Sequence, residues 1–231
     1  MSTKEAQNAT AVQNPTTQIE INAIVGNQLS VQYTGLPGNR PDTYGNYLVV
    51  WRNQNSIPYN DPNPDGFVEI TGDTSQGSQV FENITVQPGV TYVVGYAVGP
   101  KLSPGQEWGN VCTTCFITTD QKTSYITPEL TDLVAATDSV TMNYKLPSGA
   151  SPKENGAWVG IWQTGNASYD QAPIAANSIQ NPSSQGGAAI NGVQILIGQI
   201  YTVALFTSGW KAGPGGTNVQ TAMSCTATIT T

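Results

Sequence analysis

The chain has 231 residues, a formal net charge of −7 and only 10% charged residues, against roughly 25% in an average soluble protein. Its eight Lys and Arg residues are scattered singly, which argues against a nucleic-acid groove or an anionic-lipid site, because both need clustered positive charge. The sequence contains no His, so nucleophile activation by Ser-His-Asp or Cys-His is excluded and the commonest metal ligand is missing.

Residues 1–16 are polar and show no periodicity, so we predict a flexible N-terminal arm. The alternative is a strand that pairs with the sheet edge of a neighbouring subunit. No apolar segment indicates a cleavable signal peptide or a membrane span. The polar, weakly charged composition is typical of extracellular or particle-associated β proteins, whereas three Cys without a signal argue against a disulfide framework. The localisation therefore stays open.

From Gln18 onward, apolar and polar residues alternate in short runs between clusters of Gly, Pro and Asn, which is typical of a β-sandwich. The first set of predicted strands covers residues 18–24, 28–34, 46–52, 67–71, 79–84, 91–98 and 110–118. A polar connector follows at residues 119–127. The second set covers residues 130–136, 139–145, 157–163, 188–193, 199–206 and 220–229, and the counterpart of the fourth strand is not evident in this copy.

The two sets are copies of one unit of about 110 residues. Seven residues recur at nearly constant spacing, as the pairs Tyr33/Tyr144, Leu36/Leu146, Trp51/Trp162, Tyr59/Tyr169, Gly77/Gly186, Tyr92/Tyr201 and Cys115/Cys225. A unit of this size matches one immunoglobulin-type sandwich. We therefore predict an all-β chain with one sandwich at residues 17–120 and a second at residues 121–231.

The stretch VQPGVTY at residues 86–92 resembles the tyrosine corner of fibronectin type III domains, in which a Pro-Gly turn precedes a strand that opens on Tyr. The second copy keeps Gly198 and Tyr201 but has no Pro. The resemblance implies two tandem immunoglobulin/fibronectin-III-like β-sandwiches in which the hydroxyls of Tyr92 and Tyr201 bond nearby backbone. It implies no activity, because such sandwiches host many functions.

Aromatic residues alternate along the third predicted strand of each copy, at Tyr47 and Trp51 and again at Trp158 and Trp162. We expect Trp51 and Trp162 to pack in the core against the facing sheet.

The loops that follow these strands carry the first candidate ligand residues. Tyr59 and Asp61 lie in the first loop, and Tyr169 and Asp170 lie at equivalent places in the second. A ring can cover the apolar face of a pyranose while carboxylate and amide groups bind its hydroxyls. The alternative is that each Tyr covers the end of its sandwich, with Asx turns beside it.

Two Trp residues in Gly-rich loops, Trp108 and Trp210, are the second binding candidates. An exposed Trp is enriched where surfaces meet glycans or proteins. The alternative is that each ring folds back over its sandwich.

The segment DPNPDG at residues 61–66 resembles the opening of a calcium-binding loop. Asp61, Asn63, Asp65 and Glu69 could each supply oxygen, but Gly72 occupies the place where such a loop has Glu. The alternative is a rigid turn. The acidic residues between 61 and 73 are also the only dense carboxylate group that a glycosidase mechanism could use.

Cys112 and Cys115 are three residues apart on a predicted strand, so their side chains point to opposite faces and do not suit redox chemistry.

We predict a non-enzymatic, bivalent, lectin-like binding protein that uses Tyr59, Asp61, Trp108, Tyr169, Asp170 and Trp210. Its partner would be a glycan or a protein surface, and calcium is the one cofactor that the sequence raises. The alternative is a structural protein that self-assembles as a homo-oligomer or decorates a larger particle, which the low charge and the N-terminal arm favour. A carboxylate-based glycosidase is the third hypothesis.

Overall fold

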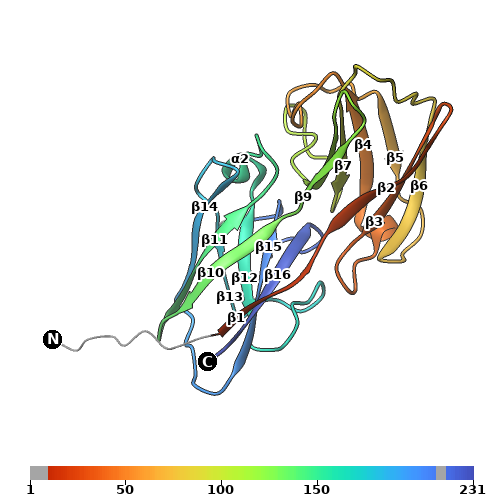
Figure 1. Ribbon diagram of the computed structural model, residues 1–231. Coiled ribbons are helices and arrows are strands. Elements are labelled where there is room, and N and C mark those ends of the chain that lie inside the picture. Colours follow the sequence, from red (N-terminus) through yellow and green to blue (C-terminus); the bar gives the residue numbers. More distant parts are fainter. Residues whose placement is uncertain (1–9, 212–216) are drawn as a thin grey trace.

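A computed structural model describes residues 10–211 and 217–231, with side chains from residue 15 onward. The described residues form sixteen strands and two helices of four residues each, arranged as two β-sandwiches side by side (Figure 1). The all-β class and the tandem arrangement predicted from the sequence are confirmed. No helix in the described part of the chain is long and apolar enough to cross a membrane.

Sandwich 1 packs a three-stranded sheet against a five-stranded sheet. The three-stranded sheet has the order β2–β3–β6, and these strands span Gln18–Val25, Gln28–Thr34 and Gln76–Glu82. The five-stranded sheet has the order β5–β4–β7–β8–β9, with bounds Gly66–Glu69, Tyr47–Arg52, Tyr92–Ala97, Val111–Ile117 and Thr123–Ile126.

Sandwich 2 repeats this order. Its three-stranded sheet is β10–β11–β14, with bounds Glu129–Ala135, Ser139–Lys145 and Gln185–Asn191. Its five-stranded sheet is β13–β12–β15–β16–β1, with bounds Ala175–Ser178, Trp158–Trp162, Ile200–Phe206, Met223–Thr230 and Thr10–Thr16. The short β13 is the strand that the sequence pattern did not reveal.

Two short helices also recur, α1 at Pro41–Tyr44 and α2 at Pro152–Asn155. Each begins with Pro and ends at a Gly with positive φ, Gly45 at 73° and Gly156 at 68°. Pro fits the first helical turn, and Gly adopts the left-handed conformation that ends it without steric cost. The repeat thus extends to the turns between strands.

The fifth strand of each large sheet corrects the predicted domain limits. Residues 10–16, predicted to be part of a flexible arm, form β1 and pair with β16 of sandwich 2; residues 1–9 lie outside the described residues. Residues 123–126, predicted to belong to the second domain, form β9 and pair with β8 of sandwich 1. Sheet-edge backbone groups accept almost any extended segment, so these strands lack the alternation that marks buried ones.

The two tyrosine corners form as predicted. The hydroxyl of Tyr92 donates to the carbonyl of Thr85 (2.9 Å) and accepts from the N–H of Gln87 (3.1 Å). The hydroxyl of Tyr201 accepts from the N–H of Leu196 (3.0 Å). Both rings are fully buried, so each corner fixes the segment that enters a central strand.

The prediction that Trp51 and Trp162 lie in the sandwich cores is wrong. On β4, Leu48 and Val50 face the core of sandwich 1, whereas Trp51 belongs to a separate apolar cluster on the outer face of the large sheet. Trp162 lies in the matching cluster of sandwich 2. Because successive side chains point to opposite faces of a strand, a strand buried throughout must have cover on both faces.

Candidate functional site

The outer faces of the two large sheets are covered by loops that the sandwiches exchange. Leu36, in the loop before α1 of sandwich 1, lies in the apolar cluster of Trp158 and Trp162 in sandwich 2. Leu146, the repeat equivalent of Leu36, lies in the core of its own sandwich, and the adjacent Pro147 lines a small pocket together with Val93 of sandwich 1. The two turns are therefore reciprocal in place, since both lie at the interface, although different residues pack there.

Tyr169 and Tyr59 mark the same reciprocity. A Cβ placed on Gly38 of sandwich 1 would lie 3.6 Å from the ring of Tyr169, and one on Gly149 of sandwich 2 would lie 3.3 Å from the ring of Tyr59. Gly38 and Gly149 are themselves repeat equivalents with positive φ, 83° and 85°. Each Tyr thus packs across the interface onto a turn of the other sandwich.

The hydroxyl of Tyr169 joins a polar network within this interface. It accepts a hydrogen bond from Nδ2 of the buried Asn39 (3.2 Å), whose Oδ1 accepts from Nδ2 of Asn46 (2.8 Å). The ring stacks on Tyr44 with a centroid separation of 5.1 Å. Burial raises the pKa of the Tyr169 hydroxyl, with a smaller opposing effect of the Asn39 hydrogen bond.

The hydroxyl of Tyr59 is buried and has no hydrogen-bond partner among the described residues. Its ring packs against the core of sandwich 2 and against the outer-face cluster of sandwich 1. Burial raises the pKa of this hydroxyl, so the group stays neutral at physiological pH. Both side chains are half-buried and each ring packs against the other sandwich, so contact of Tyr59 and Tyr169 with a ligand stays a prediction.

Trp108 is fully buried, which contradicts its predicted role as an exposed binding residue. Its ring meets that of Trp51 edge-on at a centroid separation of 5.3 Å, and its Nε1 donates to the backbone carbonyl of Asp61 (2.7 Å). The Lys101 ammonium lies 4.5 Å from the ring centroid, within range of a cation–π interaction. The ring folds back over the outer face, as the alternative interpretation held.

Trp210 remains half-buried and lies 6.4 Å from Trp158, between ring centroids. Asp170 is exposed, and its backbone N–H bonds the hydroxyl of Ser168. The six predicted ligand residues therefore do not form one site: Trp108 is fully buried, Asp170 is exposed, the other four are partly buried, and the set is divided between the two sandwiches.

The acidic loop of sandwich 1 gives its carboxylates other partners. Oδ1 of Asp61 accepts from the N–H of Asn63 (3.0 Å) in an Asx turn. Oδ2 of Asp65 accepts from the N–H of Arg52 (2.6 Å), and the Arg52 guanidinium lies 3.6 Å from Oδ1. The described residues contain no group of three or more acids, Cys or His placed to hold a metal. Asp61 and Asp65 thus accept from backbone N–H groups, Glu69 ends β5, and calcium binding by this loop stays a prediction.

Hydrogen bonds also lower the pKa of Asp73, which lies at the end of the same acidic stretch. The backbone N–H and hydroxyl of Thr43 hold the pKa of this carboxyl below its usual range, and the Arg40 guanidinium adds to the effect. The general acid of a glycosidase needs a raised pKa. The acidic stretch therefore does not supply that group at Asp73.

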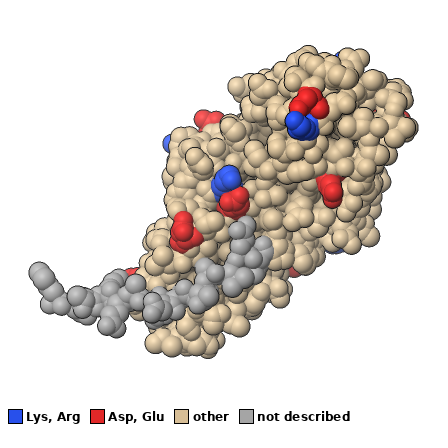
Figure 2. All heavy atoms as spheres, in the orientation of Figure 1, with Lys and Arg blue, Asp and Glu red and all other residues tan. Residues whose placement is uncertain are grey.

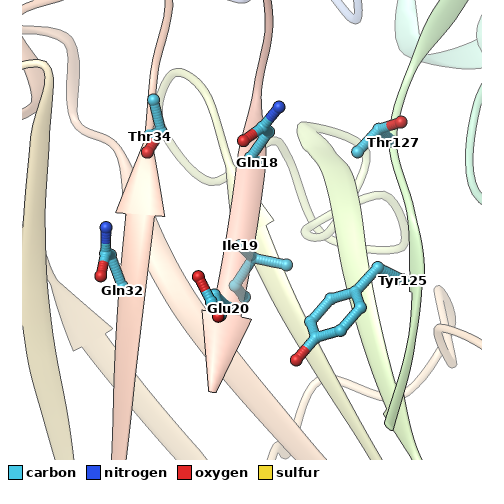
Figure 3. Close-up of a pocket in the computed structure, with 7 residues that line it drawn as sticks. All are labelled: Gln18, Ile19, Glu20, Gln32, Thr34, Tyr125 and Thr127. Atoms are coloured by element: carbon cyan, nitrogen blue, oxygen red, sulfur yellow. The ribbon is translucent and has the colours of Figure 1, made fainter. Parts of the chain in front are cut away.

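A groove between β2 and β9 is a candidate that the sequence analysis missed (Figure 3). It has a volume of about 280 Å³. Gln18 and Glu20 of β2 pair across the ladder with Thr34 and Gln32 of β3, so these polar side chains share one face. Tyr125 of β9 is 44% exposed and borders this face. The sequence carried one signal for the strand that holds Tyr125. Residues 120–126 are the repeat counterparts of residues 10–16, and both segments form the edge strand of a large sheet.

Charged residues are few and scattered on the surface. Figure 2 shows one face on which positive side chains do not gather. Arg40, Arg52, Lys122 and Lys145 are in ion pairs with acidic residues. This distribution offers no stripe of positive charge on that face for a phosphate backbone to follow.

The cysteines are free and buried. Burial raises the pKa of Cys112 to about 11 and that of Cys115 to about 12. A redox motif needs a thiolate near neutral pH, so these thiols act as small apolar side chains.

No family model matches the chain, and no curated protein matches it in sequence. Among solved structures, the chain is similar to the FN1–FN3 domains of chicken CNTN1, at 13% sequence identity and with a TM-score of 0.26. That similarity covers 91% of this chain and 64% of the other, so the chain spans less than two thirds of that structure. The fold assignment rests on the strand order and tyrosine corners described above.

Proposed function

We propose that this chain is a non-catalytic structural protein that self-assembles through the edges of its sheets. A β-sandwich suits a binding or structural role and carries no activity of its own. The observation that carries the proposal is the chemistry of the edge strands. β1 (TAVQNPT), β9 (TSYI), β13 (AANS) and β14 (QGGAAIN) end sheets and contain no charged residue.

Uncharged edges favour pairing with another chain. Soluble proteins commonly guard an edge strand with Lys or another charged residue, because its unpaired N–H and C=O groups are a template for a further strand. In this chain, charged residues occur on other edge strands, such as Glu20 on β2 and Glu69 on β5. Sandwich 2 has the most unguarded edges, which favours it as the assembling half.

The packing of the predicted aromatic ligand residues supports the same proposal. Tyr59, Tyr169 and Trp108, which would have been the aromatic contacts of a bivalent lectin, hold the sandwiches together or cover their outer faces. The result is a stiff two-sandwich body, a suitable unit for an assembly. The partner in this proposal is a protein surface, supplied by further copies of the chain.

Light scattering after size-exclusion chromatography tests the proposal. We expect the full chain to have a mass several times that of one chain, rising with concentration. Lys introduced on an uncharged edge of sandwich 2, as Gln13→Lys on β1 or Gln185→Lys on β14, should lower the mass more than Ser124→Lys on β9 of sandwich 1. The control is Thr141→Lys, an exposed position on the central strand β11. A chain that stays monomeric at all concentrations contradicts the proposal.

Saccharide binding at the groove of Figure 3 is a second candidate function. The exposed ring of Tyr125 beside Gln18, Glu20 and Gln32 combines an aromatic surface with amide and carboxylate groups. A glycan array followed by calorimetric titration tests it, with Tyr125→Ala as the variant and Val134→Ala, an exposed apolar position on sandwich 2, as the control. The absence of binding to any saccharide contradicts this candidate.

A further inference from the structure

We propose that the first part of β1 is exchanged between copies: residues 10–13 leave β16 of their own chain and pair with β16 of a second copy. This inference rests on the proposed self-assembly and names the strand and the partner that carry it. It follows from a comparison of β1 with β9, from the interruption of the β1 ladder and from the sequences of the two strands.

β1 and β9 make the same addition to the two sandwiches. β9 pairs antiparallel with β8, where Cys115 lies opposite Tyr125. β1 pairs antiparallel with β16, where Cys225, the equivalent of Cys115, lies opposite Thr16. Each strand therefore fills the same edge at nearly the same register, and this edge of either sandwich accepts an added strand.

The two strands differ in how the chain connects them to their partners. β9 follows β8 through a tight turn, in which the N–H of Thr118 donates to the carbonyl of Lys122 (2.9 Å). The hairpin makes this pairing local. β1 is joined directly to β2 of sandwich 1, yet its partner β16 lies at the opposite end of the sequence, in sandwich 2. No hairpin joins β1 to β16, so the same edge of a second copy offers residues 10–13 a chemically identical partner.

A break in the ladder marks where the exchanged part begins. The register shifts between Gln13 and Thr16, and the intervening Pro15 has no N–H to donate. Beyond this break, Thr17 is fully buried and its N–H donates to the carbonyl of Ser224 (3.0 Å). Its hydroxyl lies 2.8 Å from that of Thr113. Thr17 thus stays fixed between the sandwiches while residues 10–13 can separate.

The segment before the break is short and regular. Four consecutive Cα pairs join residues 10–13 to residues 230–227, from Thr10 with Thr230 to Gln13 with Ala227. Neither β1 nor β16 contains a charged residue that would repel a second copy. Each chain both donates and accepts a strand, so reciprocal exchange gives a closed dimer and successive exchange gives a longer chain.

Cysteine pairs at Val12 and Thr228, which are Cα partners, test the exchange directly. One copy carries Val12→Cys and the other carries Thr228→Cys, and the two copies have tags of different size. After mixing under mild oxidation, we expect a disulfide-linked heterodimer on a non-reducing gel. The control pairs Val12→Cys with Thr141→Cys, on the other sheet of sandwich 2. Unsubstituted chains show the background from the native buried thiols.

A locked variant separates this inference from the proposed function. The double variant Val12→Cys with Thr228→Cys, oxidised at high dilution, holds β1 on its own chain. We expect it to remain monomeric and to assemble once the disulfide is reduced. If the locked chain assembles as well as the unsubstituted chain, or no heterodimer forms, the exchange is wrong while self-assembly stands. If the unsubstituted chain is monomeric, self-assembly itself is wrong.

Discussion

The two sandwiches share one backbone plan but cover the outer faces of their large sheets in different ways. In sandwich 1, Tyr47 lies opposite Ala97, and the small Ala leaves room for Trp108 to enter from the following loop. In sandwich 2, Trp158 lies opposite Phe206, and the two rings stack in parallel at 3.8 Å. These rings fill the space that Trp108 takes in sandwich 1, so Trp210 stays half-buried.

This difference shows that the repeat preserves the strand order and the burial of a face while the residue that covers it changes. At this point of the outer face, the covering ring of sandwich 1 comes from a loop, as Trp108, whereas that of sandwich 2 comes from the sheet itself, as Phe206. Substitutions of matched residues therefore test whether the two faces differ as the contacts indicate.

The largest expected difference lies between Trp108→Ala and Trp210→Ala. Trp108→Ala removes a fully buried ring and leaves the Asp61 carbonyl without its donor, so we expect it to lower the free energy of unfolding by about 3–5 kcal/mol. Trp210→Ala removes a half-buried ring and should cost about 1–2 kcal/mol. Urea denaturation of both variants gives the two values. Equal costs would show that the two loops cover their sandwiches alike.

The tyrosine corners give the next difference. Tyr92→Phe breaks two hydrogen bonds, with the Thr85 carbonyl and the Gln87 N–H, and we expect a cost of about 2 kcal/mol. Tyr201→Phe breaks the bond from the Leu196 N–H and should cost about 1 kcal/mol. Both variants keep the ring, so cavity effects cancel. A larger cost for Tyr201→Phe would contradict the expectation that the corner of sandwich 1, with two hydrogen bonds to its hydroxyl, contributes more stability.

Much of the fold follows from the sequence because its signals are local. Alternation and turn residues predicted the strands Gln28–Thr34 and Ser139–Lys145 with their observed bounds. The Gly-turn-Tyr pattern also predicted the corners, since the Tyr hydroxyl reaches backbone only a few residues away. The two edge strands β1 and β9 were missed, because edge pairing satisfies backbone groups and leaves little trace in side-chain pattern.

The candidate site was harder to predict because its residues meet across the repeat. Tyr59 and Tyr169 recur at equivalent positions, and the sequence allowed either two ligand sites or one structural role. In the structure, Tyr59 packs on the turn at Gly149 of sandwich 2, and Tyr169 packs on the turn at Gly38 of sandwich 1. An interface between two halves of one chain has no local signature, since what buries each residue lies about 90 or more positions away in the sequence. Side-chain type alone therefore suggested a glycan.

The smallest expected difference lies within that interface, between Tyr169→Phe and Tyr59→Phe. Tyr169→Phe removes the acceptor of Asn39 Nδ2 inside a buried network, so we expect a cost of about 1 kcal/mol in the free energy of unfolding. Tyr59→Phe removes a buried hydroxyl that has no partner among the described residues, so stability should stay unchanged or rise slightly. Urea denaturation of both variants, which differ from the parent by one oxygen atom each, measures the difference. A substantial loss on Tyr59→Phe would show that this hydroxyl is bonded in solution, and the two halves of the interface would then be alike in polarity as well as in shape.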